Sequence, residues 1–346
     1  MKILDTTIRD GSYAVDFKFS CKDVQDLVLK SSKIGIEYIE IGHGMGLNAS
    51  SLEHGFSLQT DMEYMKAAKQ VSGNSKLGFF CIPNIARIKD IDIANENGIA
   101  FIRIGVNVGQ YKEAIPYIER AKKYGMEVFV NFMKTYAYLP EQIAEVSKYM
   151  AEQGVKGVYI VDSAGSMEKN DIGRYIDAIR KKTDIPMGFH GHNNLGLAVE
   201  NTIYCVEQGI EYIDCTYQGL GRSLGNASLE QVVMVLEKRG YKTGYDVPRV
   251  LEYGYAALKN IVRDKLTNPL DYVCGYTGFH SSFLKEIYRC SSENQVDPLR
   301  LIIAFSKENV VTMDYGRLCE IANTMPKDQE DNPYSFAEYF TEKYRE

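Results

Sequence analysis

Two histidines separated by one residue are the most informative chemical feature of this sequence. His190 and His192 close a short apolar run within Gly188-Phe-His-Gly-His-Asn-Asn194. Residues i and i+2 of a β-strand point to the same face, so both imidazoles can reach one metal ion. Asp10, near the start of the chain, can add a hard oxygen ligand from another strand. The three residue types therefore predict a site for a divalent metal.

A carboxylate and two imidazoles leave open positions on an octahedral ion and suit Mn²⁺, Mg²⁺ or Fe²⁺, with Co²⁺ and Zn²⁺ as alternatives. A 2-oxo acid can chelate such an ion through its carboxylate and keto oxygens. The ion then acts as a Lewis acid for an enolate formed by C–C cleavage or proton loss. Arg9, beside Asp10, can stabilise the enolate oxygen. The alternative interpretation is a pair of hydrogen-bonded core histidines and a structural ion pair.

Other polar residues follow predicted strands and are weaker candidates. Ser163 can bind a substrate carboxylate, or else end a turn or cap a helix. Glu40 and His43 suit acid–base or ligand roles, and structural hydrogen bonds equally well. Asn226 can reach the metal or a residue that holds it. Arg222 can meet a substrate anion or lie in solvent.

Eight strand-like runs alternate with amphipathic segments over about 240 residues, the count and length of a (β/α)8 TIM barrel. A doubly wound sheet is the alternative, because both folds repeat the βαβ pattern. The candidate residues all follow the carboxyl ends of predicted strands, which converge at one mouth in a barrel, so the barrel is favoured. The predicted strands are Lys2–Thr7, Tyr38–Gly42, Leu77–Ile82, Phe101–Val106, Val128–Phe132, Gly157–Val161, Pro186–His190 and Tyr212–Thr216.

The pattern changes near residue 245. We therefore expect a catalytic barrel domain over residues 1–245 and a helical C-terminal domain over residues 246–346. The helices predicted for the second domain are Arg249–Lys265, Ser281–Ser291, Pro298–Phe305, Tyr315–Met325 and Phe336–Tyr344.

Composition narrows the functional classes. The 346 residues are 45% hydrophobic and 25% charged, with a net charge of −6 and no basic cluster, so we expect neither nucleic-acid nor membrane binding. The start of the chain lacks the apolar core of a signal peptide. The seven cysteines are scattered, odd in number and without a Cys-x-x-Cys pair, which indicates free thiols in a cytoplasmic protein.

Five motifs together resemble the DRE-TIM metallolyase superfamily, the HMG-CoA lyase-like group. That group includes 3-hydroxy-3-methylglutaryl-CoA lyase, isopropylmalate and homocitrate synthases, and 4-hydroxy-2-oxovalerate aldolase. The segments Glu40–Phe56 and Gly275–Phe283 are most similar to the aldolase branch. The motifs are Leu4-Asp-Thr-Thr-Ile-Arg-Asp-Gly11, Gly42-His-Gly-x-Gly46, Val161-Asp-Ser-x-Gly165, His190-Gly-His-Asn193 and Gly219-x-Gly-x-x-x-Gly-Asn226.

The resemblance implies a class II aldolase, a carbon–carbon lyase that cleaves or forms a bond of a 4-hydroxy-2-oxo acid through a pyruvate enolate. It implies Mn²⁺ held by Asp10, His190 and His192. It also implies that Arg9 stabilises the enolate. From the residues themselves we expect Arg9, Ser163 and His190 to contact the substrate. The C-terminal helices would dock an acylating aldehyde dehydrogenase, and a homo-oligomer is a further expectation.

Two other functions fit the barrel less well. An acyl-CoA-dependent Claisen-type lyase or synthase uses the same barrel, but the segment Gly275–Phe283 matches the aldolase branch. A non-catalytic barrel is disfavoured, because Arg9, Asp10, His190 and His192 are all present.

The sequence departs from the aldolase pattern in two places. The aldolases carry His where this chain has Tyr13 and Tyr where it has His280, so the two residue types are exchanged. We expect Tyr13 and His280 to serve as a proton-transfer pair, with His280 as the general base because its ordinary pKa lies near 6.5. The alternative is that both positions changed with a different substrate and that His280 is an ordinary surface or helix-start residue. Asn131, Lys134 and Tyr136 replace more apolar residues, which indicates a more polar or charged aldehyde portion, such as a sugar-like or a carboxylated one.

Overall fold

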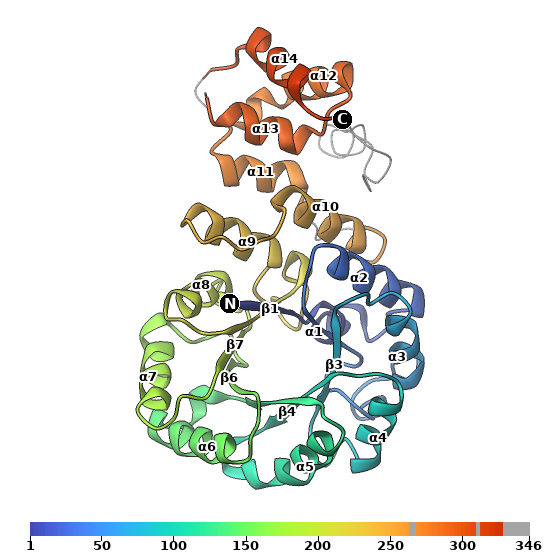
Figure 1. The fold of residues 1–346 in the computed structure, drawn as a ribbon, viewed down its shortest axis with the longest axis vertical. Helices are drawn as coiled ribbons and strands as arrows, with labels where there is room; N and C mark the ends of the chain where they lie inside the picture. Colours follow the sequence, from blue (N-terminus) through green and yellow to red (C-terminus); the bar gives the residue numbers. More distant parts are fainter. Residues whose placement is uncertain (263–266, 309–311, 328–346) are drawn as a thin grey trace. The chain divides into compact units, whose positions relative to one another are not determined.

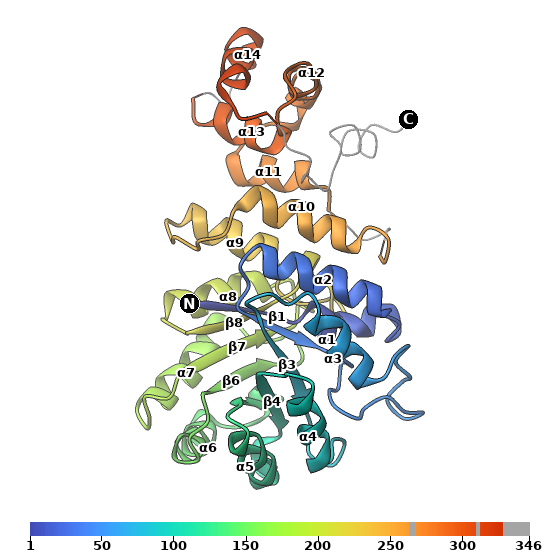
Figure 2. The ribbon, with the colours of Figure 1, turned by 45° about the vertical axis from the view of Figure 1, so that its right-hand side comes forward.

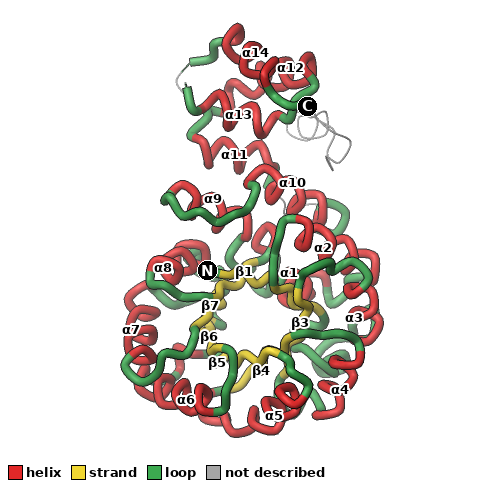
Figure 3. The backbone as a smooth tube through the Cα atoms, in the orientation of Figure 1, coloured by secondary structure: helices red, strands yellow, loops and turns green. Residues whose placement is uncertain are grey.

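The computed structural model describes residues 1–262, 267–308 and 312–327. Eight parallel strands close into a barrel in the order β1 to β8, surrounded by helices (Figures 1 and 3). Because β1 pairs with both β2 and β8, the sheet has no open edge, and the barrel is confirmed over the doubly wound sheet. The strands are β1 Lys2–Asp5, β2 Tyr38–Ile41, β3 Lys76–Cys81, β4 Phe101–Val106, β5 Glu127–Phe132, β6 Gly157–Asp162, β7 Met187–Gly191 and β8 Tyr212–Cys215.

Local signals in the sequence set the ends of the surrounding helices. At the start of α2 the Ser20 hydroxyl accepts the Asp23 N–H, and the Asp23 carboxylate accepts the Ser20 N–H. Gly35, Gly98 and Gly209 end helices with φ of +88°, +77° and +75°, as expected for C-cap glycines. The surrounding helices are α2 Cys21–Lys33, α3 Asp61–Lys69, α4 Ile88–Glu96, α5 Ile115–Lys123, α6 Pro140–Glu152, α7 Lys169–Arg180 and α8 Ala198–Glu207.

Shorter helical turns follow several strands and carry candidate residues. They are α1 Thr7–Gly11, η1 Ser12–Val15, η2 Val108–Ala114, η3 Thr135–Ala137 and η4 Tyr217–Gly219. Helix α9 (Leu229–Lys238) follows the last strand, and the Gln231 N–H donates to the Ser228 hydroxyl at its start, as the Ser-x-x-Gln pattern predicts.

Five aromatic side chains fill the inside of the barrel and form what we call the aromatic layer. Their ring centroids lie 5.0 to 6.5 Å apart, mostly edge to face. All five are almost fully buried, so they supply much of the apolar contact that holds the strands together. The members are Tyr38, Phe101, Phe129, Tyr159 and Tyr212.

The chain divides into two compact units, Met1–Val232 and Val233–Glu346. This division falls within α9, and the limits of 1–245 and 246–346 stay a prediction. In the second unit α13 packs against α11, α12 and α14 (Figure 2). The predicted helix Phe336–Tyr344 lies outside the described residues. The helices of this unit are α10 Val247–Leu258, α11 Pro269–Thr277, α12 Leu284–Asn294, α13 Pro298–Ser306 and α14 Tyr315–Thr324, with the turn η6 Ser281–Phe283.

None of the described helices combines the length and the apolar character needed to cross a membrane. All seven cysteines are free thiols, as their number and spacing predict.

Candidate active site

A cavity of about 370 Å³ lies at the carboxyl ends of the barrel strands. The predicted metal and substrate residues and Tyr13 line it, whereas Glu40, His43 and Asn226 are not among its described lining. The topology thus brings together positions that are far apart in the sequence. The metal and substrate residues that line the cavity are Arg9, Asp10, Ser163, His190 and His192.

Asp10 was predicted on a strand, but it lies on helix α1, after strand β1 has ended. Strand β1 ends at Asp5, whose carboxylate accepts the backbone N–H of Thr7 at 2.8 Å and also its hydroxyl. The Asp10 N–H then donates to the Thr6 carbonyl at 2.8 Å, which closes a helical turn. This turn, rather than an extended strand, directs the Asp10 carboxylate toward the cavity.

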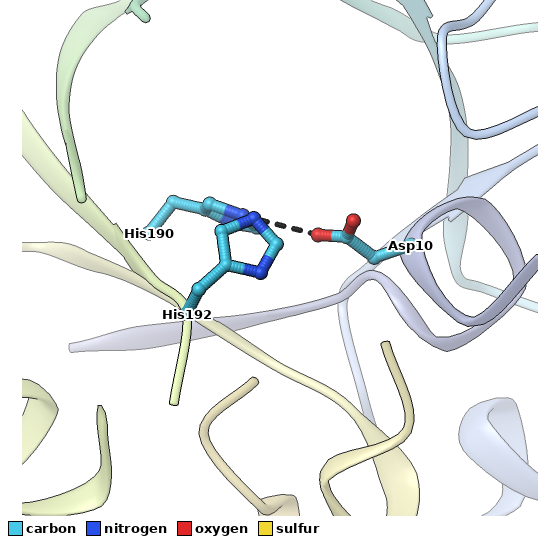
Figure 4. Close-up of side chains that lie close together, drawn as sticks. All are labelled: Asp10, His190 and His192. Carbon is cyan, nitrogen blue, oxygen red and sulfur yellow. Dashed lines mark ion pairs between the residues drawn. The ribbon is translucent and has the colours of Figure 1, made fainter. Parts of the chain in front are cut away.

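The two histidines meet the Asp10 carboxylate at one point (Figure 4). One ligand atom from each of the three residues lies within 4.8 Å of the other two. Strand β7 ends at Gly191, and His192 stays in place through a bridge to Asn226. The predicted set of one carboxylate and two imidazoles thus converges from the start and the middle of the chain.

Hydrogen bonds fix His190 on both ring nitrogens. Nε2 lies 3.0 Å from Asp10 Oδ2, and Nδ1 lies 2.7 Å from Asp214 Oδ2. Burial alone would lower the pKa of His190, but the two carboxylates outweigh it and raise the pKa. Burial would likewise raise the pKa of Asp10, yet the charges of Arg9 and His190 hold it well below its usual range. Both pKa shifts favour a positive charge between Asp10 Oδ2 and His190 Nε2. A metal cation at this position would be stabilised in the same way.

His192 is the neutral member of the set. Burial lowers its pKa to about 4, so the ring is uncharged at neutral pH, the form that binds metals. Its Nδ1 atom is buried and has no hydrogen-bond partner among the described residues. His192 thus has a neutral ring with one nitrogen free of hydrogen bonds from the described residues, and it lies beside a carboxylate of low pKa. These properties fit a divalent ion bound by Asp10, His190 and His192.

Arg9 is held rigidly beside this set. Its Nε donates to Glu40 Oε2 at 2.7 Å, and its Nη1 lies 3.1 Å from Asp10 Oδ1. The guanidinium also lies over the Phe80 ring, 4.9 Å from the ring centroid. A fixed cation at the edge of the cavity suits the stabilisation of an oxyanion.

A buried ionic layer supports Arg9 and His190 from inside the barrel. We use this name for Glu40, Arg103, Asp214 and His190. Arg103 lies 3.2 Å from Glu40 Oε2 and 2.6 Å from Asp214 Oδ2. Because Glu40 also binds Arg9 and Asp214 also binds His190, Arg103 orients both site residues through its two carboxylates.

Tyr13 lies flat against the backbone of the loop after β2. A Cβ atom at Gly44 would come 2.2 Å from the Tyr13 ring, so this approach requires glycine. The Arg222 guanidinium lies over the Tyr13 ring, 5.9 Å from the ring centroid. Burial, and then the charge of Asp10, raise the pKa of Tyr13, which keeps the phenol protonated at neutral pH.

Asn226 completes the group around the metal residues. Its Nδ2 donates to Asp10 Oδ2 at 3.1 Å and lies 3.4 Å from His190 Nε2. Its Oδ1 is so close to Gly221 that a Cβ atom there would lie at 1.7 Å, which explains the glycine. Asn226 therefore contacts two of the three proposed ligands, as predicted for a supporting residue.

Family comparison adds to this geometry. Residues 1–255 match the HMGL-like family. The chain belongs to the HMGL-like family. The 4-hydroxy-2-oxovalerate aldolase of Carboxydothermus hydrogenoformans is 33% identical over 328 residues, 94% of this chain and 98% of that protein. The oxaloacetate decarboxylase of Mycobacterium tuberculosis is 39% identical over 250 residues, 72% of this chain and 74% of that protein.

The HMGL-like barrel also matches solved structures. The HMG-CoA lyase of Brucella melitensis superimposes with a TM-score of 0.66 at 19% identity, covering 76% of this chain and 99% of that one. At this identity the likeness shows the fold alone. The resemblance to the HMG-CoA lyase-like superfamily, inferred from the five motifs, is confirmed.

His43 plays a structural part in this HMGL-like site. Its Nδ1 accepts the Met45 N–H at 3.1 Å, its Nε2 lies 3.2 Å from the Gly55 carbonyl, and its ring stacks on Phe17. With both nitrogens engaged by backbone groups, it shapes the loop after β2. The structural interpretation of His43 is therefore the better one.

His280 lies in the second unit, as the N-cap of η6, with an exposed side chain. Its Nδ1 accepts the Ser282 N–H at 3.2 Å, so the neutral ring carries its proton on Nε2. It does not appear among the described residues that line the barrel cavity. Its role as a base stays a prediction.

Arg103 and Asp214 are functional residues that the sequence analysis missed. Each is a single charged residue inside an otherwise apolar strand, Phe101–Val106 and Tyr212–Cys215. Strands of a parallel barrel are buried on both faces, and charged residues are seldom buried without a partner. The lone charge in each apolar strand is the signal that could have marked both as buried, paired residues, although not which residue each one pairs with.

Proposed function

We propose that this protein is a divalent-metal-dependent aldolase acting on a 4-hydroxy-2-oxo acid through a pyruvate enolate. The observation that carries the proposal is the convergence of Asp10, His190 and His192, with Arg9 beside them, on one cavity. The near full-length similarity to proteins named 4-hydroxy-2-oxovalerate aldolase supports the same reaction.

A divalent ion, with Mn²⁺ as the first candidate, would be held by Asp10, His190 and His192 and supplies Lewis acidity when bound. In cleavage, a base removes the proton of the C4 hydroxyl and the C3–C4 bond breaks. C4 becomes the aldehyde carbon, and the bonding electron pair moves through C3 to the keto oxygen. C3 then takes up a proton and becomes the methyl group of pyruvate.

Three residues that line the cavity have separate roles in this reaction. The Arg9 guanidinium offers its charge to the enolate oxygen, and Glu40 keeps it in place. The protonated phenol of Tyr13 can donate a hydrogen bond to the C4 oxygen, and the base that takes the C4 hydroxyl proton in cleavage returns it in the reverse direction. The Ser163 hydroxyl, at the wall of the cavity, is placed to donate to the substrate carboxylate.

His280 remains our proposed general base, with Tyr13 as its partner. His280→Ala should lower the kcat of aldol cleavage by about 100-fold, the usual contribution of a general base. Cleavage that survives within a few fold would remove His280 from the mechanism. His54, half-buried and outside the described cavity lining, offers the control, and His54→Ala should retain wild-type turnover.

Decarboxylation of oxaloacetate is the second candidate function, favoured by the 39% identity to a protein of that name. Loss of CO₂ from C3 leaves the same pyruvate enolate and needs no base. The two functions separate in His280→Ala, which should lose aldol cleavage and keep decarboxylation. The Claisen-type thioester reaction has only the fold likeness to HMG-CoA lyase in its favour.

Deuterium exchange into pyruvate tests the proposal directly. Pyruvate is incubated with the protein in D₂O, and methyl deuteration is followed by NMR with Mn²⁺ and with a chelator. We expect exchange that needs the metal and falls about 1000-fold in Asp10→Asn, but not in the exposed control Asp184→Asn. Exchange that is indifferent to both chelator and Asp10→Asn would reject the metal-dependent mechanism.

Three further expectations rest on the proposed function. These are an acylating aldehyde dehydrogenase bound through the C-terminal helices, a homo-oligomer and a cytoplasmic location. Size-exclusion chromatography with a purified dehydrogenase of this kind tests the first two. Separate elution of both proteins would count against the partner.

A further inference from the structure

The charges that line the cavity are not balanced by carboxylates of the protein. Three cationic side chains, Arg9, Lys134 and Arg222, face the cavity, and Asp10 is the one acidic residue among its described lining. The charge of Arg9 is neutralised by its ion pairs with Asp10 and Glu40. Two cations therefore remain for anionic groups of a ligand.

Arg222 belongs to the metal side of the cavity. Its Nη2 donates to the Ser163 carbonyl at 2.9 Å and lies 3.4 Å from His192 Nε2. A 2-oxo acid that chelates an ion held by His192 would place its own carboxylate near this guanidinium. Arg222 with the Ser163 hydroxyl thus accounts for the first anionic group.

Lys134 stands apart from these contacts on the wall that follows β5. Its side chain has no hydrogen-bond or ion-pair partner among the described residues. Its backbone is left-handed, with φ of 55° and ψ of 45°, and its N–H donates to the Ser163 hydroxyl oxygen at 3.0 Å. A left-handed residue other than glycine costs on the order of 1 kcal/mol, so this turn favours glycine or asparagine over lysine.

The next residue anchors the turn. The Thr135 hydroxyl donates to the Phe132 carbonyl at 2.7 Å and accepts the Val161 N–H at 2.9 Å. These bonds tie the turn to both β5 and β6. Among the described residues, Lys134 is therefore an exposed, unpaired cation that stands on a fixed backbone at the cavity wall.

We propose that Lys134 binds a second carboxylate, carried by the aldehyde portion of the substrate. This inference rests on the proposed function and narrows its substrate to the 4-hydroxy-2-oxo dicarboxylates. Cleavage would then yield pyruvate and an aldehyde that bears a carboxylate. A carboxylate meeting an ammonium group in a partly enclosed cavity forms a charge-assisted hydrogen bond, which a methyl group at the same position cannot form.

Two matched ligands test the proposal without requiring turnover. 2-Oxoadipate and 2-oxohexanoate share a six-carbon chain and a 2-oxo acid group, and only the former has a distal carboxylate. Their dissociation constants are measured by calorimetry with Mn²⁺ for the wild type, Lys134→Met and Lys134→Arg. Lys112→Met, a change at an exposed lysine outside the cavity lining, is the control.

We expect the wild type and Lys112→Met to bind 2-oxoadipate about 10- to 100-fold more tightly than 2-oxohexanoate. Lys134→Met should bring the ratio close to one, and Lys134→Arg should keep most of it. Equal binding of both ligands by the wild type, or an unchanged ratio in Lys134→Met, would overturn the assignment.

Pyruvate deuteration, measured on the same samples, separates the two proposals. Exchange without a preference for 2-oxoadipate rejects the role of Lys134 alone. A preference that depends on Lys134, without exchange, supports the dicarboxylate site and rejects the aldolase.

Discussion

The aromatic and ionic layers of the barrel share strands β2, β4 and β8, where their residues lie two positions apart. On β2 Tyr38 precedes Glu40, on β4 Phe101 precedes Arg103, and on β8 Tyr212 precedes Asp214. Both layers are buried, yet one is held by dispersion and apolar burial and the other by directed charge pairs. On each shared strand, a residue that stabilises the barrel by apolar packing comes before a residue that supports the candidate site. The two layers should therefore respond differently to substitution.

The largest expected effect is a difference in the free energy of unfolding between the variants Arg103→Met and Phe101→Leu. Arg103→Met leaves the carboxylates of Glu40 and Asp214 buried without their shared cation, which costs about 3 to 5 kcal/mol. Phe101→Leu removes a few carbon atoms from a layer that can repack, at about 1.5 kcal/mol. Urea unfolding of both variants measures the two free energies.

A triple variant sharpens this test. Adding Glu40→Gln and Asp214→Asn to Arg103→Met removes the unpaired charges and should recover part of the lost stability, although the site would no longer hold Arg9 and His190. Equal costs for Arg103→Met and Phe101→Leu would contradict the distinction between the layers.

Glu230 shows how burial changes the pKa of a carboxylate that is not paired with an arginine of the described residues. It accepts the Gln218 N–H and the Ser228 hydroxyl, each at 2.8 Å, and burial raises its pKa to about 7 from 4.5. Between about pH 4.5 and 7 the folded state keeps this proton and the unfolded state releases it. The free energy of unfolding should therefore fall as pH rises through this window, by up to about 3 kcal/mol.

Glu230→Gln removes this titration and should flatten the decline. Urea unfolding at pH 5 and pH 8 measures the slope for the wild type, Glu230→Gln and the exposed control Glu211→Gln. Identical slopes in all three proteins would mean that Glu230 is ionised in the folded state at pH 5.

The smallest expected effect is on metal affinity, and Asp214→Asn tests it by changing what orients the His190 ring. The variant keeps a hydrogen-bond acceptor for Nδ1 but removes the charge that favours this ring position. We expect Mn²⁺ binding to weaken by about 10-fold in a calorimetric titration, with Asp184→Asn as the exposed control. Unaltered affinity would show that Asp214 serves the ionic layer and not the metal residues.

The fold and the cluster of candidate metal ligands could be predicted from the sequence because both depend on short-range patterns. The eight strands follow from apolar runs and their glycine-ended helices, and His190 and His192 follow from their spacing. The helical position of Asp10 was not predicted, since it depends on the Asp5 side chain capping a turn immediately after the strand.

Partners across the barrel were harder to predict. Arg103 meets Asp214 across 111 residues, and nothing near either residue in the sequence marks the other. The left-handed backbone of Lys134 was equally hidden, because the Ser163 hydroxyl that supports it comes from the next strand of the barrel. Such pairs become visible only when the strand order is known.

The hydrogen bond from Asn226 to Asp10 joins residues 216 positions apart, and strand β1 finds its second neighbour only in β8. During synthesis at roughly 5 to 20 residues per second, the first strand therefore waits on the order of 10 to 40 seconds for that neighbour. Throughout this time its outer edge and the Asp10 carboxylate are without their final partners. The nascent chain is thus most open to mispairing and to capture by chaperones at its very first strand, and ligand binding can begin only after the last one has emerged.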